Sequence, residues 1–255
     1  MRSVVMKFGG ACFVTHESTT LVAQKIVDRI GECGHAAVVV VSARCGMTDA
    51  LLEQMRPMGD ARGQQVRDVM LATGELQSAA LLAAELLIAG HAAEVIAPWT
   101  VFHTNDTHGD ATISEVRADS VFSTIRRGAI PIVPGFIGAT DDGSITTLGR
   151  GGTDYSAVAL GVALQADCVE LYKAEVDGVY DADPRTHPAA QRFCTLNHAD
   201  ALTLSLNGAR VLQTKAARLA MRGNMAIRVK HAFHDGPGTV IGALLTQEPR
   251  SCSIC

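Results

Sequence analysis

Short apolar runs that are rich in β-branched residues alternate along this chain with longer segments of helical periodicity. The clearest run is AAVVVVSA at 36–43, and SVVMKF at 3–8 and AIPIVPGFIGA at 129–139 are similar. Strands that are apolar at every position, rather than at every second one, have both faces buried. Helices between such strands cover the two faces of a mostly parallel sheet. We therefore expect an α/β fold, a three-layer sandwich with a mostly parallel central sheet.

The remaining segments fit the same alternation. Helical patterns cover 16–34, 46–55, 64–90, 154–166 and 208–223, and further strands are expected at 93–97, 167–173 and 225–233. Thr48 or Asp49 is expected to cap the helix at 46–55, because hydroxyl and carboxylate side chains accept hydrogen bonds from the first helical N–H groups. The segments 57–63 and 106–111 have the composition of long flexible connectors.

Composition restricts the class of protein. With 255 residues, 47% hydrophobic and 19% charged, the chain can bury a substantial core and is not disordered. The formal net charge of −4 and the lack of a basic run argue against nucleic acid or an anionic membrane as partner. We identify no apolar stretch of the roughly 20 residues that span a bilayer, and the first ten residues do not resemble a signal peptide.

The seven cysteines indicate a reduced, cytoplasmic protein. Five of them are scattered, mostly beside apolar residues: Cys12, Cys33, Cys45, Cys168 and Cys194. The tail contains the sole C-x-x-C, at Cys252 and Cys255, which without a second pair or a histidine is weak evidence for a metal or redox site. We expect the tail, 243–255, to be disordered.

Four segments that follow strands are candidates for ligand binding, because open parallel sheets bind ligands beyond the carboxyl ends of their strands. They are KFGG (7–10), VVSARCGMT (40–48), PGFIGATDDGSITTLGRGGTDYSA (134–157) and YKAEVDGVYDADPR (172–185). In the first, a strand ends in Gly9 and Gly10, whose backbone N–H groups can approach an anion closely, and Lys7 adds a positive charge. Phosphate is the obvious anion.

The third segment is the most informative, because TLGRGGTD places a cation beside glycines at the start of a buried helix. A helix N-terminus favours negative charge, and the guanidinium of Arg150 can pair with a carboxylate or a phosphate. Asp154 cannot bind an anion itself and instead could orient a lysine such as Lys7. An ordinary turn capped by Thr153 or Asp154 would leave Arg150 unexplained.

Several common site motifs are missing from the sequence. There is no G-x-x-x-x-G-K-[ST], no G-x-G-x-x-G after the first strand and no G-x-S-x-G. The nine histidines show no H-x-x-x-H or H-E-x-x-H spacing, which argues against a zinc site made by the protein alone.

Taken together, these segments resemble the amino acid kinase family, and within it the aspartokinase catalytic domain. The resemblance is carried by KFGGAC, VVSARCGMT, TGELQSAALLA, TLGRGGTD and VDGVYDADPR, and it extends from residue 3 to about 242. It implies the amino acid kinase fold and transfer of the γ-phosphoryl group of ATP to the β-carboxylate of L-aspartate. It also implies a homodimer, and Mg²⁺ held mainly by phosphates and water rather than by protein ligands.

The resemblance further implies a role for each site residue. Lys7 and Asp154 would be catalytic, Arg150 would pair with the α-carboxylate of the acceptor and Glu75 with its α-ammonium. The acceptor pocket would be completed by Ser42, Thr48, Phe136 and Thr153. The nucleotide and its phosphates would be bound by Lys7, Gly9, Gly10, Gly151, Gly152, Lys173, Glu175, Tyr180, Asp183, Arg185 and Arg210.

Three of these residues have plainer alternatives. Glu75 could be a surface carboxylate, although Thr73-Gly74-Glu75 is expected to open an otherwise apolar helix, where an acid on the buried side needs a cationic partner. Phe136 could belong to the core, and Thr48 could serve only as an N-cap.

The chain departs from the aspartokinase pattern in three places. Ala11-Cys12 replaces a pair of hydroxyl residues after KFGG, which removes two donors near the phosphates. The segment 172–178 has one extra residue before VDG, so Lys173 and Glu175 could replace the usual nucleotide contacts. Gln213-Thr214 stands where relatives have His-Pro, while Arg210 and Lys215 remain as cations that could reach phosphates.

We expect one kinase domain over 1–242, with an acceptor-binding lobe at about 1–160 and a nucleotide-binding lobe at about 161–242. Aspartokinases continue from here into regulatory ACT domains, and we expect this polypeptide to lack that route of feedback control and to serve a specialised pathway. Two alternatives stay open: a kinase of the same fold that phosphorylates another small acid, and a non-catalytic protein that binds nucleotides or oxyanions.

Overall fold

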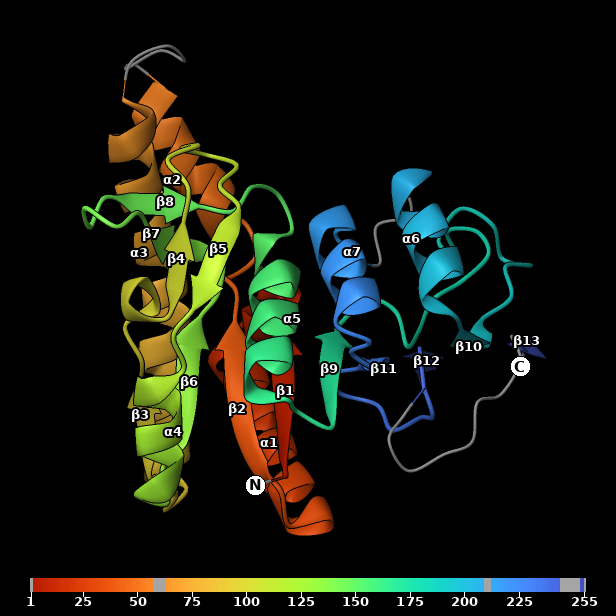
Figure 1. Ribbon diagram of the computed structural model, residues 1–255. Coiled ribbons are helices and arrows are strands. Elements are labelled where there is room, and N and C mark those ends of the chain that lie inside the picture. Colours follow the sequence, from red (N-terminus) through yellow and green to blue (C-terminus); the bar gives the residue numbers. More distant parts are fainter. Residues whose placement is uncertain (1, 57–62, 209–211, 244–252, 255) are drawn as a thin grey trace.

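The computed structural model of the protein describes residues 2–56, 63–208, 212–243 and 253–254. Its largest feature is a nine-stranded sheet (Figure 1). In order across this sheet, the strands are β13 (Ser253–Ile254), β10 (Phe193–Leu196), β12 (Thr239–Ile241), β11 (Ile227–His231), β9 (Cys168–Lys173), β1 (Ser3–Phe8), β2 (Ala36–Val41), β6 (Ile130–Pro134) and β3 (Ala93–Val95).

Most neighbouring strands in this sheet run parallel. β1 pairs in parallel with β2 and with β9, and of the described strand pairs in this sheet only β11–β12 and β10–β13 are antiparallel. The register places Lys7 opposite Val40 of β2 and Leu171 of β9. The carboxyl ends of the three central strands are therefore level, and the predicted mostly parallel sheet is confirmed.

Helices cover both faces of the sheet and form the outer layers. They are α1 (His16–Cys33), α2 (Met47–Met55), α3 (Gln64–Ile88), α4 (Asp119–Arg126), α5 (Gly152–Leu164), α6 (His198–Leu206) and α7 (Thr214–Arg222), with the short 3-10 helices η1 (Gly10–Phe13) and η3 (Pro98–Thr100). Successive residues of β1 serve opposite faces: Val5 packs in a core with α5 and α7, whereas Val4 and Met6 pack in a second core with α1 and α3. This confirms the three-layer sandwich.

A second, four-stranded sheet was not predicted. Its strands, in order, are β5 (Ile113–Val116), β4 (Phe102–Thr104), β7 (Ile137–Ala139) and β8 (Ile145–Thr147). The run 129–139, predicted as one strand, is divided between β6 and β7 at Gly135 and Phe136, where Phe136 has a left-handed φ of 66°. A Cβ at Gly135 would lie 2.5 Å from Thr153 Cγ2, so the chain can turn beside the start of α5 only without a side chain there.

The helix α3 begins near the start of the predicted helical segment 64–90, and not at Thr73-Gly74-Glu75, where we expected an apolar helix to open. Because it begins at Gln64, Glu75 lies in its middle and not at its start. By length and composition α3 could cross a membrane, yet 56% of its most apolar window is buried inside the protein. It packs against α1, α2 and β8, which is the behaviour of a core helix.

Glycines, rather than the predicted polar residues, cap two helices. The N-cap of α2 is Gly46 with φ 78°, and the N-cap of α5 is Gly151 with φ 77°. The predicted cap of α2 at Thr48 or Asp49 is therefore wrong, and the alternative cap of α5 at Thr153 or Asp154 is excluded as well. The chain turns into each helix through a left-handed residue, a conformation that suits glycine. The predicted helix 208–223 is observed as α7, which starts at Thr214; residues 209–211 lie outside the described residues.

Two segments expected to be flexible contain defined structure. The segment 106–111 is tied to α3, since the backbone N–H of Gly109 donates to Asp68; most of the other connector, 57–62, lies outside the described residues. In the tail, β13 pairs antiparallel with β10, so 253–254 is ordered, while 244–252 and 255 lie outside the described residues.

Cys194 is disulfide-bonded and so is not the free thiol that we predicted, whereas Cys12, Cys45 and Cys168 are free.

Candidate active site

Two lysines share one buried carboxylate at the carboxyl ends of the central strands. Lys7, near the end of β1, places its Nζ 2.7 Å from Asp154 Oδ1, and both side chains are 7% exposed. Lys173, the last residue of β9, places its Nζ 3.1 Å from Asp154 Oδ2. Asp154 reaches both lysines from the first turn of α5, a helix in which 11 of 13 residues are buried. The predicted contact between Lys7 and Asp154 is present, and Lys173 joins it.

The charges at this junction of Lys7, Lys173 and Asp154 do not cancel. Burial alone would raise the pKa of Asp154, but Lys173 and Lys7 together hold it at about 2, so the carboxylate is ionised at neutral pH. Burial lowers the pKa of Lys173, and the attraction of Asp154 opposes that shift. With both ammonium groups charged, one carboxylate leaves a net positive charge in a poorly solvated place. Such a site favours an anionic ligand.

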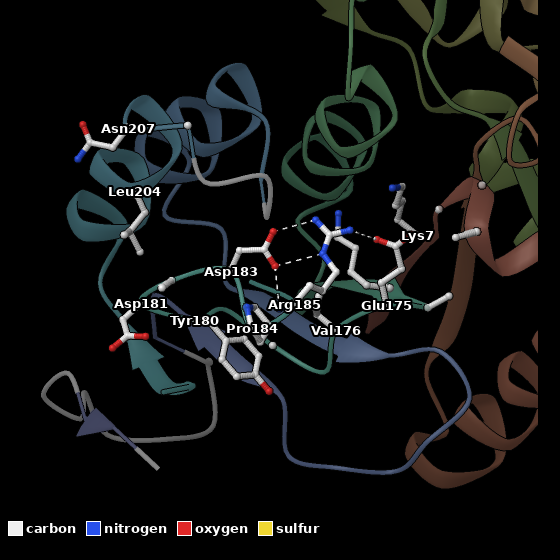
Figure 2. Close-up of a pocket in the computed structure, with 18 residues that line it drawn as sticks. Lys7, Glu175, Val176, Tyr180, Asp181, Asp183, Pro184, Arg185, Leu204 and Asn207 are labelled. Atoms are coloured by element: carbon white, nitrogen blue, oxygen red, sulfur yellow. Dashed lines mark hydrogen bonds and ion pairs between the residues drawn. The ribbon is translucent and has the colours of Figure 1, made fainter. Parts of the chain in front are cut away.

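A cavity of about 770 Å³ opens on one side of the junction. Lys7 lies at one end of it, and Leu204 and Asn207 from the α6 region lie at the other (Figure 2). The residues predicted to bind the nucleotide that line this cavity are Lys7, Gly9, Gly10, Lys173, Glu175, Tyr180, Asp183 and Arg185. The volume is within the range typical of sites for small ligands and cofactors.

Polar groups in this cavity already bind one another. The guanidinium of Arg185 lies between Asp183, at 2.9 Å, and Glu175, at 3.5 Å (Figure 2). Tyr180 donates its hydroxyl to Asp177 Oδ1 at 2.6 Å. At the end of the cavity near Lys7, a Cβ on Gly10 would lie 2.3 Å from the carbonyl oxygen of Ala43, so only glycine fits there.

A second cavity, of about 460 Å³, opens on the other side of the junction, and Lys7 is the one described residue that lines both. All six predicted acceptor-binding residues line this second cavity: Ser42, Thr48, Glu75, Phe136, Arg150 and Thr153. Gly151 and Gly152, predicted for the phosphates, line it as well and are absent from the lining of the first cavity. Arg210 lies outside the described residues.

Glu75 is a buried carboxylate with one oxygen unused. It is 3% exposed, and its Oε1 accepts a hydrogen bond from the backbone N–H of Ala43 at 3.1 Å. Its Oε2 has no hydrogen-bond partner among the described residues. Burial raises the pKa of Glu75 to about 7. A carboxylate in this position gains most from a cation that enters the cavity, because such a cation would stabilise its charged form.

Arg150 lines the same cavity as Glu75 and belongs to the loop between β8 and α5. It is flanked by Gly149 and Gly151, both with φ 77°. Its side chain is exposed and makes no hydrogen bond or ion pair with the described part of the chain. The floor includes Ser42 and Thr153, whose hydroxyl oxygens are 3.0 Å apart. The cavity thus offers an available cation, a buried acid and two hydroxyl groups, which suits a zwitterionic ligand.

Several lining residues were not predicted. The second cavity is also lined by Gln64, Arg67, Asp68 and Gly109. The segment HTNDTHGDATI, which contains Gly109, is similar to aspartokinase sequences, and this similarity could have pointed to Gly109. Lys215, considered as a phosphate contact, is held elsewhere: its Nζ donates to Asp110 Oδ1 at 2.6 Å. Among the described residues no group of three or more His, Cys, Asp or Glu side chains could hold a metal ion.

The chain is similar to known proteins over most of its length. The sequence profile of the amino acid kinase family matches residues 2–231. The aspartate kinase Ask_LysC of Stutzerimonas stutzeri (strain A1501) is 38% identical over 242 residues, which are 94% of this chain and 58% of that relative. The chain therefore spans less than two thirds of the length of this relative.

Two solved structures are similar over nearly the whole chain. The aspartate kinase from Synechocystis has a TM-score of 0.83 at 34% identity, with 97% of this chain and 40% of that chain covered. Escherichia coli aspartokinase III in complex with aspartate and ADP has a TM-score of 0.84 at 26% identity, with 94% and 64% covered. The fold of this chain is thus the one that these kinases share.

Proposed function

Because the chain belongs to the amino acid kinase family, we propose that it transfers the γ-phosphoryl group of ATP to the side-chain carboxylate of L-aspartate. The product is the acyl phosphate 4-phospho-L-aspartate. The observation that carries this proposal is the place of Lys7, at the one point where the two cavities meet. The names of the relatives and the aspartate and ADP of the E. coli neighbour support the choice of substrates.

The chemistry needs electrostatic help more than proton transfer. A side-chain carboxylate with an ordinary pKa of about 4 is already ionised at neutral pH, so its attack requires no general base. One of its oxygens forms a bond to the γ-phosphorus while the bond from that phosphorus to the β–γ bridging oxygen breaks and ADP leaves. The barrier comes from bringing an anion to a polyanion, and catalysis consists of neutralising charge and holding the reactants in line. Lys7 and Lys173 supply that charge.

We assign the first cavity to the nucleotide. Its phosphates would lie towards Lys7, Lys173 and the backbone N–H groups of Gly9 and Gly10, and the rest of the nucleotide would extend towards α6. Mg²⁺ would be held mainly by phosphates and water, as it commonly is. The acids of this cavity fit that arrangement, because Glu175 and Asp183 already pair with Arg185 and Asp181 accepts a hydrogen bond from the backbone N–H of Gln191. Bound there, the ion would offset negative charge on the phosphates.

The second cavity would hold the amino acid. Glu75 would accept the α-ammonium through its free Oε2, and Arg150 would pair with the α-carboxylate. The side-chain carboxylate would then point to Lys7. Ser42, Thr48, Phe136 and Thr153 would complete the pocket, and the N–H groups of Gly151 and Gly152, at the start of α5, would favour negative charge on the transferred group.

The test is a coupled assay of ADP release with ATP, Mg²⁺ and a panel of acceptors. We expect ADP to be released only when L-aspartate is added. Hydroxylamine should trap the acyl phosphate product as a hydroxamate. Succinate, which lacks the ammonium, should be a poor acceptor because it leaves Glu75 without a partner. Turnover with a different acid but not with L-aspartate would contradict the proposed substrate. ATP binding without turnover of any carboxylate would contradict the proposed activity.

We also propose that the protein is a homodimer that pairs through the outer face of α3. The exposed residues of that helix carry no charge: Gln65, Val66, Val69, Thr73, Gln77, Ala80, Leu81, Ala84, Leu87 and Ile88. Ile88 is 80% exposed and Leu87 57%, so the face is apolar as well as uncharged. Extended apolar faces of this kind mark interaction sites, and an uncharged face can meet its own copy without repulsion.

Leu81→Glu tests this interface, since Leu81 is 47% exposed near the middle of the exposed face. We expect light scattering after gel filtration to give the mass of a dimer for the unaltered chain and of a monomer for the variant. The fold of the protomer should be retained, with an unchanged circular dichroism spectrum, because Leu81 belongs to neither described core cluster. Leu206→Glu, at a 57% exposed position on α6, is the matched control and should leave the mass unchanged. A monomeric unaltered chain, or a dimeric Leu81→Glu variant, would disprove the interface.

A further inference from the structure

The second cavity contains a carboxylate that the proposed reaction does not use. Asp68 lies on α3, seven residues before Glu75, which is about two helical turns along the same face. Its residue is 0% exposed, yet it lines the cavity beside Glu75. A carboxyl group buried in such a place costs stability unless hydrogen bonds compensate it.

Three donors satisfy this carboxylate. The hydroxyl of Thr147 donates to Oδ1 at 2.6 Å, the backbone N–H of Gly109 donates to Oδ2 at 3.2 Å, and Nδ1 of His108 lies 2.8 Å from Oδ2. Hydrogen bonds to an ionised acceptor are shorter and stronger than those between neutral groups. Both oxygens of Asp68 therefore already have hydrogen-bond partners. The contacts of Asp68 join α3 to the loop at 108–109 and to the end of β8, segments that are distant in the sequence.

One of the segments that Asp68 joins leads to Arg150, and another touches the loop of Arg150. Thr147 is the last residue of β8, only three residues before Arg150. Gly109 belongs to the loop between β4 and β5, and that loop touches the arginine loop directly: a Cβ on Gly149 would lie 2.3 Å from Asp110 Oδ1. Removing the contacts of Asp68 would free both loops on the side that faces α3.

The opposite side of the arginine loop is held by the start of α7. The side-chain amide of Gln213 donates to the carbonyl oxygen of Arg150 at 3.0 Å, and Lys215 donates to Asp110 at 2.6 Å. The backbone at Arg150 is thus fixed between α7 and Asp68. Its guanidinium has no hydrogen bond or ion pair with the described residues, so the position of the backbone, and not a polar partner, limits where that cation can lie.

We propose that Asp68 is a positioning residue for the amino acid substrate: through Thr147 and the loop at 108–109 it fixes Arg150 at a set distance from Glu75. One helix, α3, then positions both charged groups: it carries Glu75 itself, and it holds the loop of Arg150 through Asp68. The spacing between the sites for the ammonium and the α-carboxylate is set by α3, which favours an α-amino acid. This inference rests on the proposed role of the second cavity as the acceptor site.

The test compares Thr147→Val, which removes the hydroxyl but keeps the shape, with Thr147→Ser, which keeps the hydroxyl. For Thr147→Val we expect the KM for L-aspartate to rise at least fivefold, while kcat and the KM for ATP stay within about twofold of the unaltered chain. Thr147→Ser should restore the KM. In an Arg150→Ala background, Thr147→Val should add less than a twofold change, because the hydroxyl acts through the arginine.

Other results would overturn the role of Asp68. An unchanged KM for L-aspartate in Thr147→Val, an equal rise in the KM for ATP, or full additivity with Arg150→Ala would each do so. If Thr147→Val does not fold, His108→Ala decides, since that side chain is 22% exposed and can be removed without opening the core; we then expect at least a threefold rise. Calorimetric binding of L-aspartate gives the same comparison without turnover. An unaltered chain that binds L-aspartate but does not phosphorylate it would contradict the proposed function and not the role of Asp68.

Discussion

Replacing Lys7 by alanine is expected to lower kcat at least a hundredfold, while the KM for L-aspartate changes less than about threefold. Groups that stabilise the charge of a transition state in a poorly solvated site contribute on the order of 10²–10³ in kcat. Lys7 is the described residue that lines both cavities, so its ammonium acts where the acceptor oxygen and the phosphoryl group meet. Steady-state kinetics with either substrate varied would measure this split between kcat and KM.

The matched control for Lys7→Ala is Lys173→Ala. Lys173 lines only the nucleotide cavity, so its loss should raise the KM for ATP more than it lowers kcat. Each single variant leaves Asp154 with one ammonium within 3.1 Å or less, and both proteins should therefore fold. If Lys7→Ala is folded and retains more than a tenth of the activity, the proposed site of phosphoryl transfer is wrong.

The central part of the fold could be predicted because its strands are unambiguous. β2 is an apolar run, β1 and β9 are mostly apolar, and all three are buried on both faces; the nearly uncharged segment that becomes α5 is typical of a core helix. The second sheet was missed because three of its strands, β4, β7 and β8, have three residues each, too few to show a period. The glycine caps of α2 and α5 were missed because a left-handed residue followed by a helix has no distinct polar signature.

Some candidate site residues lie together because the carboxyl ends of the central strands are level, whereas Glu75 and most nucleotide-site candidates came from the family resemblance alone. Lys7, Ser42 and Lys173 come to one edge for this reason. Asp68 could not be found in that way, since it lies within a helix and two of its three partners, His108 and Gly109, belong to a loop that resembles a flexible connector. The sequence also could not show that Gly151 and Gly152 line the acceptor cavity rather than the nucleotide cavity, which depends on how α5 enters the sheet.

Glu75→Gln is the second replacement with a large expected effect. At pH 8 we expect the KM for L-aspartate to rise at least tenfold, because a neutral amide cannot offset the charge of the α-ammonium in a buried place. A charge-assisted hydrogen bond contributes about 1.5–3 kcal/mol, and 1.4 kcal/mol is a factor of ten. The KM for ATP should stay the same, since Glu75 lines only the acceptor cavity.

The pH dependence separates this role from a structural one. The pKa of Glu75 is about 7 in the free protein, so the carboxyl becomes neutral as the pH falls below 7. The KM of the unaltered chain for L-aspartate should therefore rise between pH 8 and pH 6, whereas that of Glu75→Gln should be nearly flat. An equal slope in both proteins would show that another group binds the ammonium.

Stability should change in the opposite direction to affinity. Folding raises the pKa of this acid from its ordinary 4.5 to about 7, so the unfolded chain releases the proton at lower pH than the folded one does. The unaltered chain therefore loses stability as the pH rises from about 4.5 through 7, and above 7 the deficit is at most about 3 kcal/mol. Glu75→Gln has no such proton to lose and should unfold at a higher temperature than the unaltered chain at pH 8. Saturating L-aspartate should reverse that order, because the ammonium stabilises the carboxylate only where a carboxylate is present.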